Sequence, residues 1–382
     1  MVHAVLWQNG GITDLGTLPS GGYESEANAV NSRGQVVGAA LNAVPDANSM
    51  AVSTYWLFGI PYGYQTRAFL WEKGVMRDLG TLGTGTDAQA ILINEAGQVV
   101  GWSYVSSNPS PFCVTGFLTT DSFIWDREDG MKDLGSLGGT CTLATALNNH
   151  GQVVGTSNLA GDEKQHAFRW EHGSMQDLGG SLGGDYTGAY AMNDAGAVVG
   201  YAYFPDDTTF HATLWSHVGN MDDLGVVGKD TCSSAGSINA QTQVVGESAP
   251  DCNFDNARAF LWEGGSLINL NALIPHRSAL QLQFAENIND RGEIVGTGLD
   301  AQGNGHAVLL IPCDERHPDV EDCDYSPADA SGATKDDATQ DSNSSTVTFN
   351  ETKLSAANEM TRIRSLMAGR IRHHGTPQVL PQ

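Results

Sequence analysis

Five aspartates stand at the same place in a repeated Asp-Leu-Gly step, and their spacing suggests a chemical role. These residues are Asp14, Asp78, Asp133, Asp177 and Asp223. If the repeat arranges them in a ring, their carboxylates would attract a hard cation such as Ca²⁺, which prefers oxygen ligands. Alternatively, each aspartate caps a turn within its own repeat. We favour capping and expect no cofactor, because the position recurs with the structural unit and no Asp-x-Asp-x-Asp-Gly calcium loop is present.

Histidines and one serine motif offer weaker chemistry. Histidine opens four repeats, at His3, His166, His211 and His306. Other residue types take the same place elsewhere, which argues against a metal set; they are Arg67, Ser122 and Arg258. Residues 179–183 match Gly-x-Ser-x-Gly, but that nucleophile needs a strand-to-helix turn, and this segment is a variant of the repeat turn at 134–138. We therefore assign no catalytic residue.

Two insertions carry the candidate ligand-binding residues. They span residues 40–66 and 104–121, and both follow a Val-Val-Gly run, so they should emerge on the same side of neighbouring repeats. Long loops on a rigid scaffold commonly carry function, and aromatic faces there could stack on sugar rings or peptides. The alternative is a lid that packs its aromatic rings onto the scaffold. The candidates are Tyr55, Trp56, Phe58, Tyr62, Tyr64 and Phe112.

A repeated unit of about 45 residues must position these side chains. One copy, residues 166–200, contains four short runs rich in β-branched or aromatic residues, which predict four strands. Asn-x-x-Gly between the third and fourth runs is typical of a tight turn. The pattern predicts an all-β fold, a β-propeller of four-stranded antiparallel blades.

The number of blades follows from counting the runs. Most runs occur six times, but the His-Ala-Phe-type run occurs seven times, the last at residues 306–310. We expect six blades, with the surplus strand pairing where the ring closes. The alternative is seven blades, in which a start further upstream would supply a signal peptide and the missing strands.

The joint motif resembles the HAF-repeat family of extracellular repeat proteins. The motif is seen in residues 67–71 (Arg-Ala-Phe-Leu-Trp), 78–83 (Asp-Leu-Gly-Thr-Leu-Gly) and 94–101 (Asn-Glu-Ala-Gly-Gln-Val-Val-Gly). The resemblance covers residues 3–311. It implies a secreted or surface β-propeller with no established reaction, and it supplies no catalytic residues.

Six cysteines predict three disulfides, and two of them, Cys141 and Cys232, hold the same place in the repeat. The expected pairs are Cys113–Cys141, Cys232–Cys252 and Cys313–Cys323. Zinc binding is disfavoured because the chain has no Cys-x-x-Cys. Disulfides persist in oxidising compartments, so we expect an extracellular or cell-surface location, although no signal peptide is visible.

Charge limits the class of partner. Acidic residues outnumber basic ones 44 to 19, and the net charge is −25. Nucleic-acid binding is disfavoured, because it needs a basic face. No apolar run is long enough to cross a bilayer, so we expect no transmembrane segment. We expect a monomer with a protein or glycan ligand.

The region after the propeller, residues 1–312, is expected in three parts. Residues 313–325 form an acidic loop closed by a disulfide, and residues 326–353 form a disordered linker, because they have few large apolar side chains. Residues 354–374 form a short basic amphipathic helix. That helix could contact a membrane surface or an acidic partner, or rest on the acidic propeller.

These patterns favour a non-enzymatic extracellular or cell-surface binding protein, with the ligand on the face that carries the insertions. The alternative is a propeller enzyme, such as a glycan hydrolase or lyase with acids near the axis. Such an enzyme needs two suitably spaced acids, and the repeated aspartates are the available set. A second alternative is a structural spacer in the cell envelope.

Overall fold

A computed structural model describes residues 2–46, 49, 63–109, 113, 118–180, 182–217, 220–274, 278–314, 316–317 and 348–352. Several expectations concern residues outside these ranges. They are the aromatic residues Tyr55, Trp56, Phe58, Tyr62 and Phe112, the half-cystine Cys323, and the helix of residues 354–374.

The first half of the chain forms a hairpin and three four-stranded sheets. The hairpin is β1 (Val5–Gln8) and β2 (Gly11–Asp14). The next sheet is β3 (Ser25–Val30), β4 (Val36–Pro45), β5 (Tyr64–Glu72) and β6 (Val75–Asp78). It is followed by β7 (Ala88–Ile93), β8 (Val99–Pro109), β9 (Leu118–Asp126) and β10 (Gly130–Asp133). Then come β11 (Gly138–Leu147), β12 (Val153–Leu159), β13 (Gln165–Glu171) and β14 (Ser174–Asp177).

The second half repeats this arrangement three times. One sheet is β15 (Thr187–Met192), β16 (Val198–Tyr203), β17 (Phe210–His217) and β18 (Asn220–Gly225). The next is β19 (Cys232–Ile238), β20 (Val244–Ala249), β21 (Arg258–Glu263) and β22 (Ser266–Asn269), followed by the short 3₁₀ helix η2 (Leu270–Ala272). The last is β23 (Gln281–Ile288), β24 (Ile294–Leu299), β25 (Gly305–Ile311) and β26 (Thr348–Thr352).

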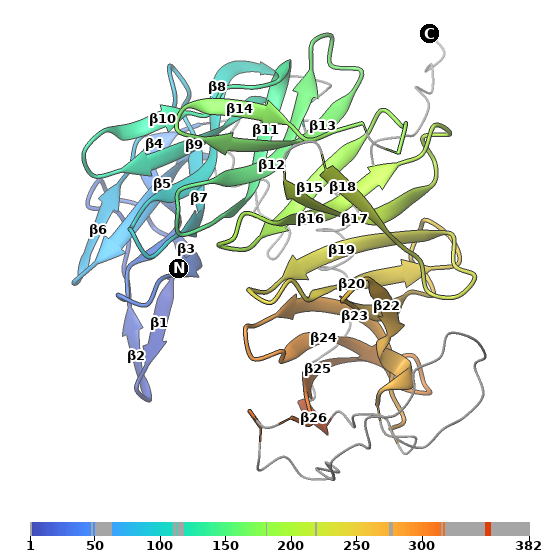
Figure 1. Cartoon of the computed structure of the whole chain (residues 1–382). Coiled ribbons are helices and arrows are strands. Elements are labelled where there is room, and N and C mark those ends of the chain that lie inside the picture. Colours follow the sequence, from blue (N-terminus) through green and yellow to red (C-terminus); the bar gives the residue numbers. More distant parts are fainter. Residues whose placement is uncertain are drawn as a thin grey trace, which may run out of the picture.

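Each four-stranded sheet pairs its strands in sequence order, all antiparallel. Figure 1 shows the sheets following one another around an arc, from the hairpin β1–β2 to the sheet β23–β26. The prediction of an all-β, propeller-like fold of four-stranded antiparallel sheets is therefore confirmed. The linker expected over residues 326–353 differs in one respect, since it contains β26, which pairs with β25 along Thr348–Thr352.

The two ends of the strands define two faces of the molecule. The Asn-x-x-Gly turns and the hairpins between third and fourth strands lie at one end, which we call the turn face. The connections between second and third strands, and those from one sheet to the next, lie at the other end, which we call the loop face. The described strands at which the two insertions begin, β4 and β8, both end on the loop face.

Hydrophobic cores lie between neighbouring sheets. In every complete sheet except the last, the second valine of the Val-Val-Gly run packs against the next sheet, and Val37, for example, joins a cluster with Ala90 and Trp125. Burying one such side chain contributes about 1.5–3 kcal/mol. The glycine that follows permits close strand contact, since a Cβ on Gly155 would lie 2.0 Å from the Leu143 carbonyl oxygen.

The turn face is held together by a ladder of asparagines, which we call the asparagine ladder. The side-chain Nδ2 of each turn asparagine donates to the backbone carbonyl of the corresponding asparagine in the next sheet. Five junctions repeat this bond: Asn31 to Asn94 (3.1 Å), Asn94 to Asn148 (3.1 Å), Asn148 to Asn193 (3.3 Å), Asn193 to Asn239 (3.0 Å) and Asn239 to Asn289 (3.0 Å). Neighbouring sheets are thus joined by one recurring polar contact as well as by apolar packing.

Candidate functional site

Two disulfides secure connections on the loop face. The structure contains the predicted pairs Cys113–Cys141 and Cys232–Cys252, with Cα–Cα distances of 5.5 and 5.2 Å. Cys313 is also disulfide-bonded, while its expected partner Cys323 lies outside the described residues. The second pair ties the start of β19 to the connection between β20 and β21.

The five repeated aspartates each bond within their own unit. The carboxylate of each accepts the backbone N–H of the glycine two residues later, at 2.7–2.8 Å. Four also pair with the residue that opens the preceding strand: His3 with Asp14, Arg67 with Asp78, His166 with Asp177 and His211 with Asp223. The hydrogen bond from His3 lowers the pKa of Asp14 below its usual value. This geometry fits turn capping.

The fifth aspartate, Asp133, faces another acid. In the pairing of β8 with β9, Asp121 lies opposite Ser103, just as Arg67 lies opposite Ala40 in the pairing of β4 with β5. Asp121, rather than Ser122, is therefore equivalent to Arg67 and occupies the opening position of its repeat. The prediction from the repeat pattern that Ser122 holds this opening position is therefore wrong by one residue. Burial and the nearby Asp133 carboxylate raise the pKa of Asp121 to about 7. Two carboxyl groups thus lie close together on the loop face.

No larger acidic or metal-binding cluster is formed in the part of the chain that the structure describes. Within it, no group of three or more His, Cys, Asp or Glu side chains is arranged to hold a metal ion. The repeated aspartates remain in separate units, and His306 bonds to Asp300 (3.2 Å) instead of a repeat aspartate.

The sixth copy of the repeat departs from the others and creates a pocket. Its Asp-Leu-Gly step reads Asn269-Leu270-Asn271, and the chain enters η2 there. The Asn269 side chain caps this turn by accepting the Asn271 backbone N–H at 3.0 Å. Asn271 then bridges to β23, donating to the Leu282 carbonyl (2.8 Å) and accepting its N–H (2.7 Å).

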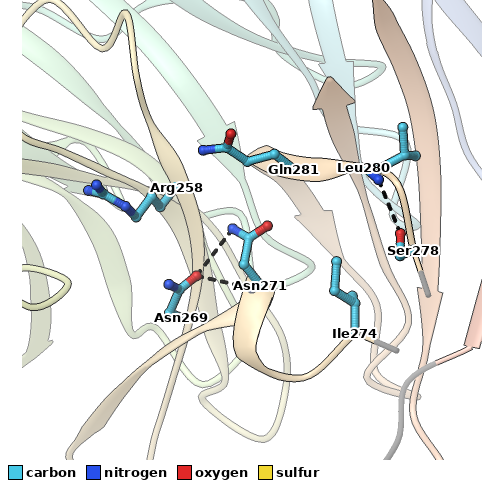
Figure 2. Close-up of a pocket in the computed structure, with 7 residues that line it drawn as sticks. All are labelled: Arg258, Asn269, Asn271, Ile274, Ser278, Leu280 and Gln281. Carbon is cyan, nitrogen blue, oxygen red and sulfur yellow. Dashed lines mark hydrogen bonds between the residues drawn. The ribbon is translucent and has the colours of Figure 1, made fainter. Parts of the chain in front are cut away.

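The pocket beside this turn has a volume of about 340 Å³. Figure 2 shows Arg258 and Asn269 on one side of Asn271, and Ile274, Ser278 and Leu280 on the other. The described lining residues are Arg258, Asn269, Asn271, Ile274, Ser278, Leu280 and Gln281. We call this site the Asn271 pocket. It opens on the loop face, because it lies between the start of β21, the end of β22 and the start of β23.

Arg258 is held at the edge of the pocket by a buried acid. Its guanidinium binds Asp230, whose side chain is 4% exposed, and Asp230 also accepts from the Ser248 hydroxyl at 2.9 Å. The neutral Asn269 stands where other copies carry the aspartate, so Arg258 turns to Asp230 instead. Its side chain remains 34% exposed, which leaves the fixed cation accessible to a ligand.

The lining of the Asn271 pocket suits recognition of hydroxyl or carboxylate groups. Amide and guanidinium groups supply donors and acceptors, and Ile274 and Leu280 supply an apolar wall. The pocket's volume of about 340 Å³ lies at the lower end of the range of about 300–1,000 Å³ found for small-molecule sites. The described lining includes no Asp, Glu, His or Cys side chain that could act as general acid or base.

Of the six predicted ligand-binding aromatic residues, Tyr64 alone lies within the described part of the chain. Its ring packs against Tyr23, with centroids 5.9 Å apart. A different aromatic cluster, which the sequence analysis did not single out, joins Tyr201, Tyr203 and Phe210 at 4.8–5.8 Å. It packs against Cys232 and Cys252, so it braces the disulfide end of the loop face.

The Asn271 pocket was also missed by the sequence analysis. Two signals pointed to it: the degenerate Asn269-Leu270-Asn271 step, and Arg258 without an aspartate partner in that step. No helix in the described chain is long and apolar enough to cross a membrane.

Comparisons with known proteins give little guidance. No protein-family model matches the chain, and no curated protein matches it. An acylaminoacyl peptidase of Pyrococcus horikoshii is 11% identical with a TM-score of 0.36, covering 76% of this chain and 51% of its own. A sialidase of Trypanosoma rangeli, in complex with 2,3-difluorosialic acid, is 9% identical with a TM-score of 0.28, covering 82% of this chain and 46% of its own.

The chain spans about half the length of these two structures. At such TM-scores neither likeness supports an argument about this protein's fold or activity. The function has to be argued from the loop face itself.

Proposed function

We propose that the protein is a non-enzymatic extracellular or cell-surface binding protein of the HAF-repeat type, and that it binds a glycan on its loop face. The observation that carries the proposal is the Asn271 pocket, where amide, hydroxyl and guanidinium groups surround a small apolar wall. Sugars present both hydroxyls and C–H faces, which such a lining matches.

The disulfides support an extracellular location. Two disulfides in the described chain, together with bonded Cys313, suit an oxidising compartment. They also pre-organise the loop face, which reduces the entropic cost of binding. The propeller in this proposal consists of six four-stranded blades and a half-blade, the hairpin β1–β2.

A glycan array, followed by calorimetry on the best binder, tests this function. We expect Gln281→Ala and Asn269→Ala to weaken binding about ten-fold, the cost of losing roughly one hydrogen bond to a ligand. Gln176→Ala, an exposed glutamine on β14, serves as the matched control and should bind like the wild type. Glycan binding that survives both pocket substitutions would place the site elsewhere, and no binding to any glycan would favour a protein ligand or a spacer.

One observation favours the enzyme alternative. Burial and the nearby Asp133 side chain raise the pKa of Asp121 to about 7, and a raised pKa is what a general acid in glycan hydrolysis requires. Incubating the protein with fluorogenic glycosides at pH 5–7 tests this. Turnover that disappears in Asp121→Asn but persists in Asp177→Asn would establish the enzyme, whereas inactivity of the wild type supports the binding protein.

A further inference from the structure

The two ends of the arc carry the unsatisfied halves of one repeating interface. Inside the arc, the second valine of one sheet faces the third-strand tryptophan of the next, as Val37 and Trp125 do in one core cluster. Val37, Val100, Val154, Val199 and Val245 are all 0% exposed. In the last sheet the equivalent residue, Val295, is 46% exposed.

The other end exposes the opposite half. Trp71, Trp125, Trp170 and Trp215 are 9% exposed or less, and each packs towards the preceding sheet. The equivalent Trp7 on β1 is 73% exposed, and its neighbours Val5 and Ile12 are 55% and 65% exposed. Val30 on β3 is 54% exposed, although its equivalents Ile238 and Ile288 are 7% and 5%.

The hairpin β1–β2 corresponds to the outer two strands of a blade. Trp7 pairs with Ile12 as Trp71 pairs with Met76, and the Leu15 N–H donates to the Ala4 carbonyl as that of Leu79 donates to Ala68. Every other strand in this position pairs on both sides, but β1 pairs with β2 alone in the described chain. Among the described residues, one edge of β1 thus has no partner strand, and such an edge can pair with an added one.

The asparagine ladder is open at the same two places. Asn289, in the last sheet, donates to Glu293 (2.6 Å) but to no further turn carbonyl among the described residues. Asn31, in the first complete sheet, donates onward to Asn94, while no described asparagine side chain donates to its own carbonyl. A single additional turn asparagine would accept from Asn289 and donate to Asn31.

We propose that the open β1 edge and the Val295 surface bind a β-hairpin with the repeat's own inner-pair sequence. Such a hairpin has two strands joined by Asn-x-x-Gly, and its second strand begins with Val-Val-Gly, as in residues 187–203. Its second strand pairs with β1, its asparagine closes the ladder, and its apolar faces cover Val295 and Val30. One occupant therefore satisfies the strand edge, the ladder and the exposed apolar residues together, by strand addition. A second copy of this chain could cover the exposed apolar residues at the two ends of the arc. It would leave the edge of β1 unpaired, because the first and second strands of each of its described sheets already pair within that sheet.

The test supplies this hairpin in two ways. In the first, a peptide of residues 187–203 is added to the full chain. In the second, residues 187–209 are fused before Val2, so that the six-residue connection that leads from β16 to β17 leads instead to β1. The matched control carries Val199→Asp and Asn193→Ala in the added copy alone. Hydrogen–deuterium exchange follows the amides of residues 5–8 and 294–299, and light scattering reports the oligomeric state.

We expect the hairpin to slow exchange in both segments by at least about ten-fold, and the control hairpin to have no effect. The fusion should also shift Trp7 emission to shorter wavelength, measured as the difference from Trp7→Phe. Val295→Ser should reduce the protection in the fusion while leaving the unextended chain unchanged, because Val295 is already exposed there.

Two results would overturn the proposal. One is unchanged exchange at residues 5–8 with both the peptide and a folded fusion. The other is a dimer of the unextended chain that protects the same segments, since the occupant would then be a second copy. Neither outcome depends on the glycan ligand, because no glycan is added, and Val295 lies near the turn-face end of β24 whereas the Asn271 pocket opens on the loop face.

Discussion

The turn face and the loop face are built from the same repeats but have opposite characters. On the turn face, five junctions repeat one asparagine contact with donor–acceptor distances of 3.0–3.3 Å. On the loop face, one copy has an acid pair, another a disulfide, and another the Asn271 pocket. The difference shows where the scaffold tolerates change: one contact recurs at every described junction of the turn face, whereas the loop-face contacts differ from one unit to the next.

The largest effect should come from breaking the ladder. Asn148 is 4% exposed, and its Oδ1 accepts the backbone N–H groups of His150 and Gln152, both at 3.0 Å. Asn148→Ala leaves these donors and the Asn193 carbonyl without that partner, so we expect a loss of about 3 kcal/mol in urea unfolding. Asn220→Ala, at an exposed position of β18, should cost less than about 0.5 kcal/mol. Equal losses in the two variants would mean that the ladder contributes no special stability.

Removing a loop-face disulfide should have a somewhat smaller effect. Cys232→Ala with Cys252→Ala frees a connection closed across 20 residues, and we expect a loss of about 2–3 kcal/mol, chiefly from the greater entropy of the unfolded chain. Urea unfolding of the double variant measures this. The reduced wild-type protein, in which every disulfide is opened, provides the comparison, and a reduced protein as stable as the oxidised one would contradict the expectation.

The acid pair should make stability depend on pH. The pKa of Asp121 is about 7 in the folded protein and near 3.8 when unfolded, so the folded state binds more protons between these values. This contribution is fully present below about pH 4 and is lost as the pH rises through 7. Asp121→Asn should therefore be more stable than the wild type by about 2 kcal/mol at pH 8 and equal to it at pH 4, since one pKa unit corresponds to about 1.4 kcal/mol and partial exposure reduces the effect. Thermal unfolding of the wild type and of Asp121→Asn at pH 8 and pH 4 tests this expectation. If the variant gained the same stability at both pH values, the gain would have a cause other than the ionisation of Asp121.

The smallest effect is expected at an ordinary loop-face pair. His166 and Asp177 are 2.9 Å apart, but the aspartate side chain is 45% exposed. His166→Gln should change the unfolding free energy by about 0.5 kcal/mol or less, because exposed pairs are screened by water. A loss as large as that of Asn148→Ala would remove the contrast between the two faces.

Much of the fold was predictable because the repeat carries local information. The Phe-x-Trp alternation, the Asn-x-x-Gly turn and the Val-Val-Gly run each specify strand or turn within a few residues, and six copies reinforce the pattern. Two disulfides followed from the same alignment, since Cys141 and Cys232 hold equivalent places.

The candidate site was less predictable, because it depends on departures from the repeat. A single-residue error in aligning 121–125 hid the acid pair, and strand register with Gly101 opposite Phe123 was needed to correct it. The Asn271 pocket needs Asn269 and Gln281 from different sheets to lie side by side, which no local pattern specifies.

The amino-acid sequence by itself determined the strands, their order within each sheet and the disulfide partners Cys113–Cys141 and Cys232–Cys252, because these follow from short-range periodicity copied along the chain. The tertiary structure alone decided that Asn31 to Asn289 form one ladder and that Val295 and Trp7 remain exposed at its ends. Those features arise between sheets, where the partner of a side chain is set by how neighbouring units stack rather than by the residues beside it in sequence.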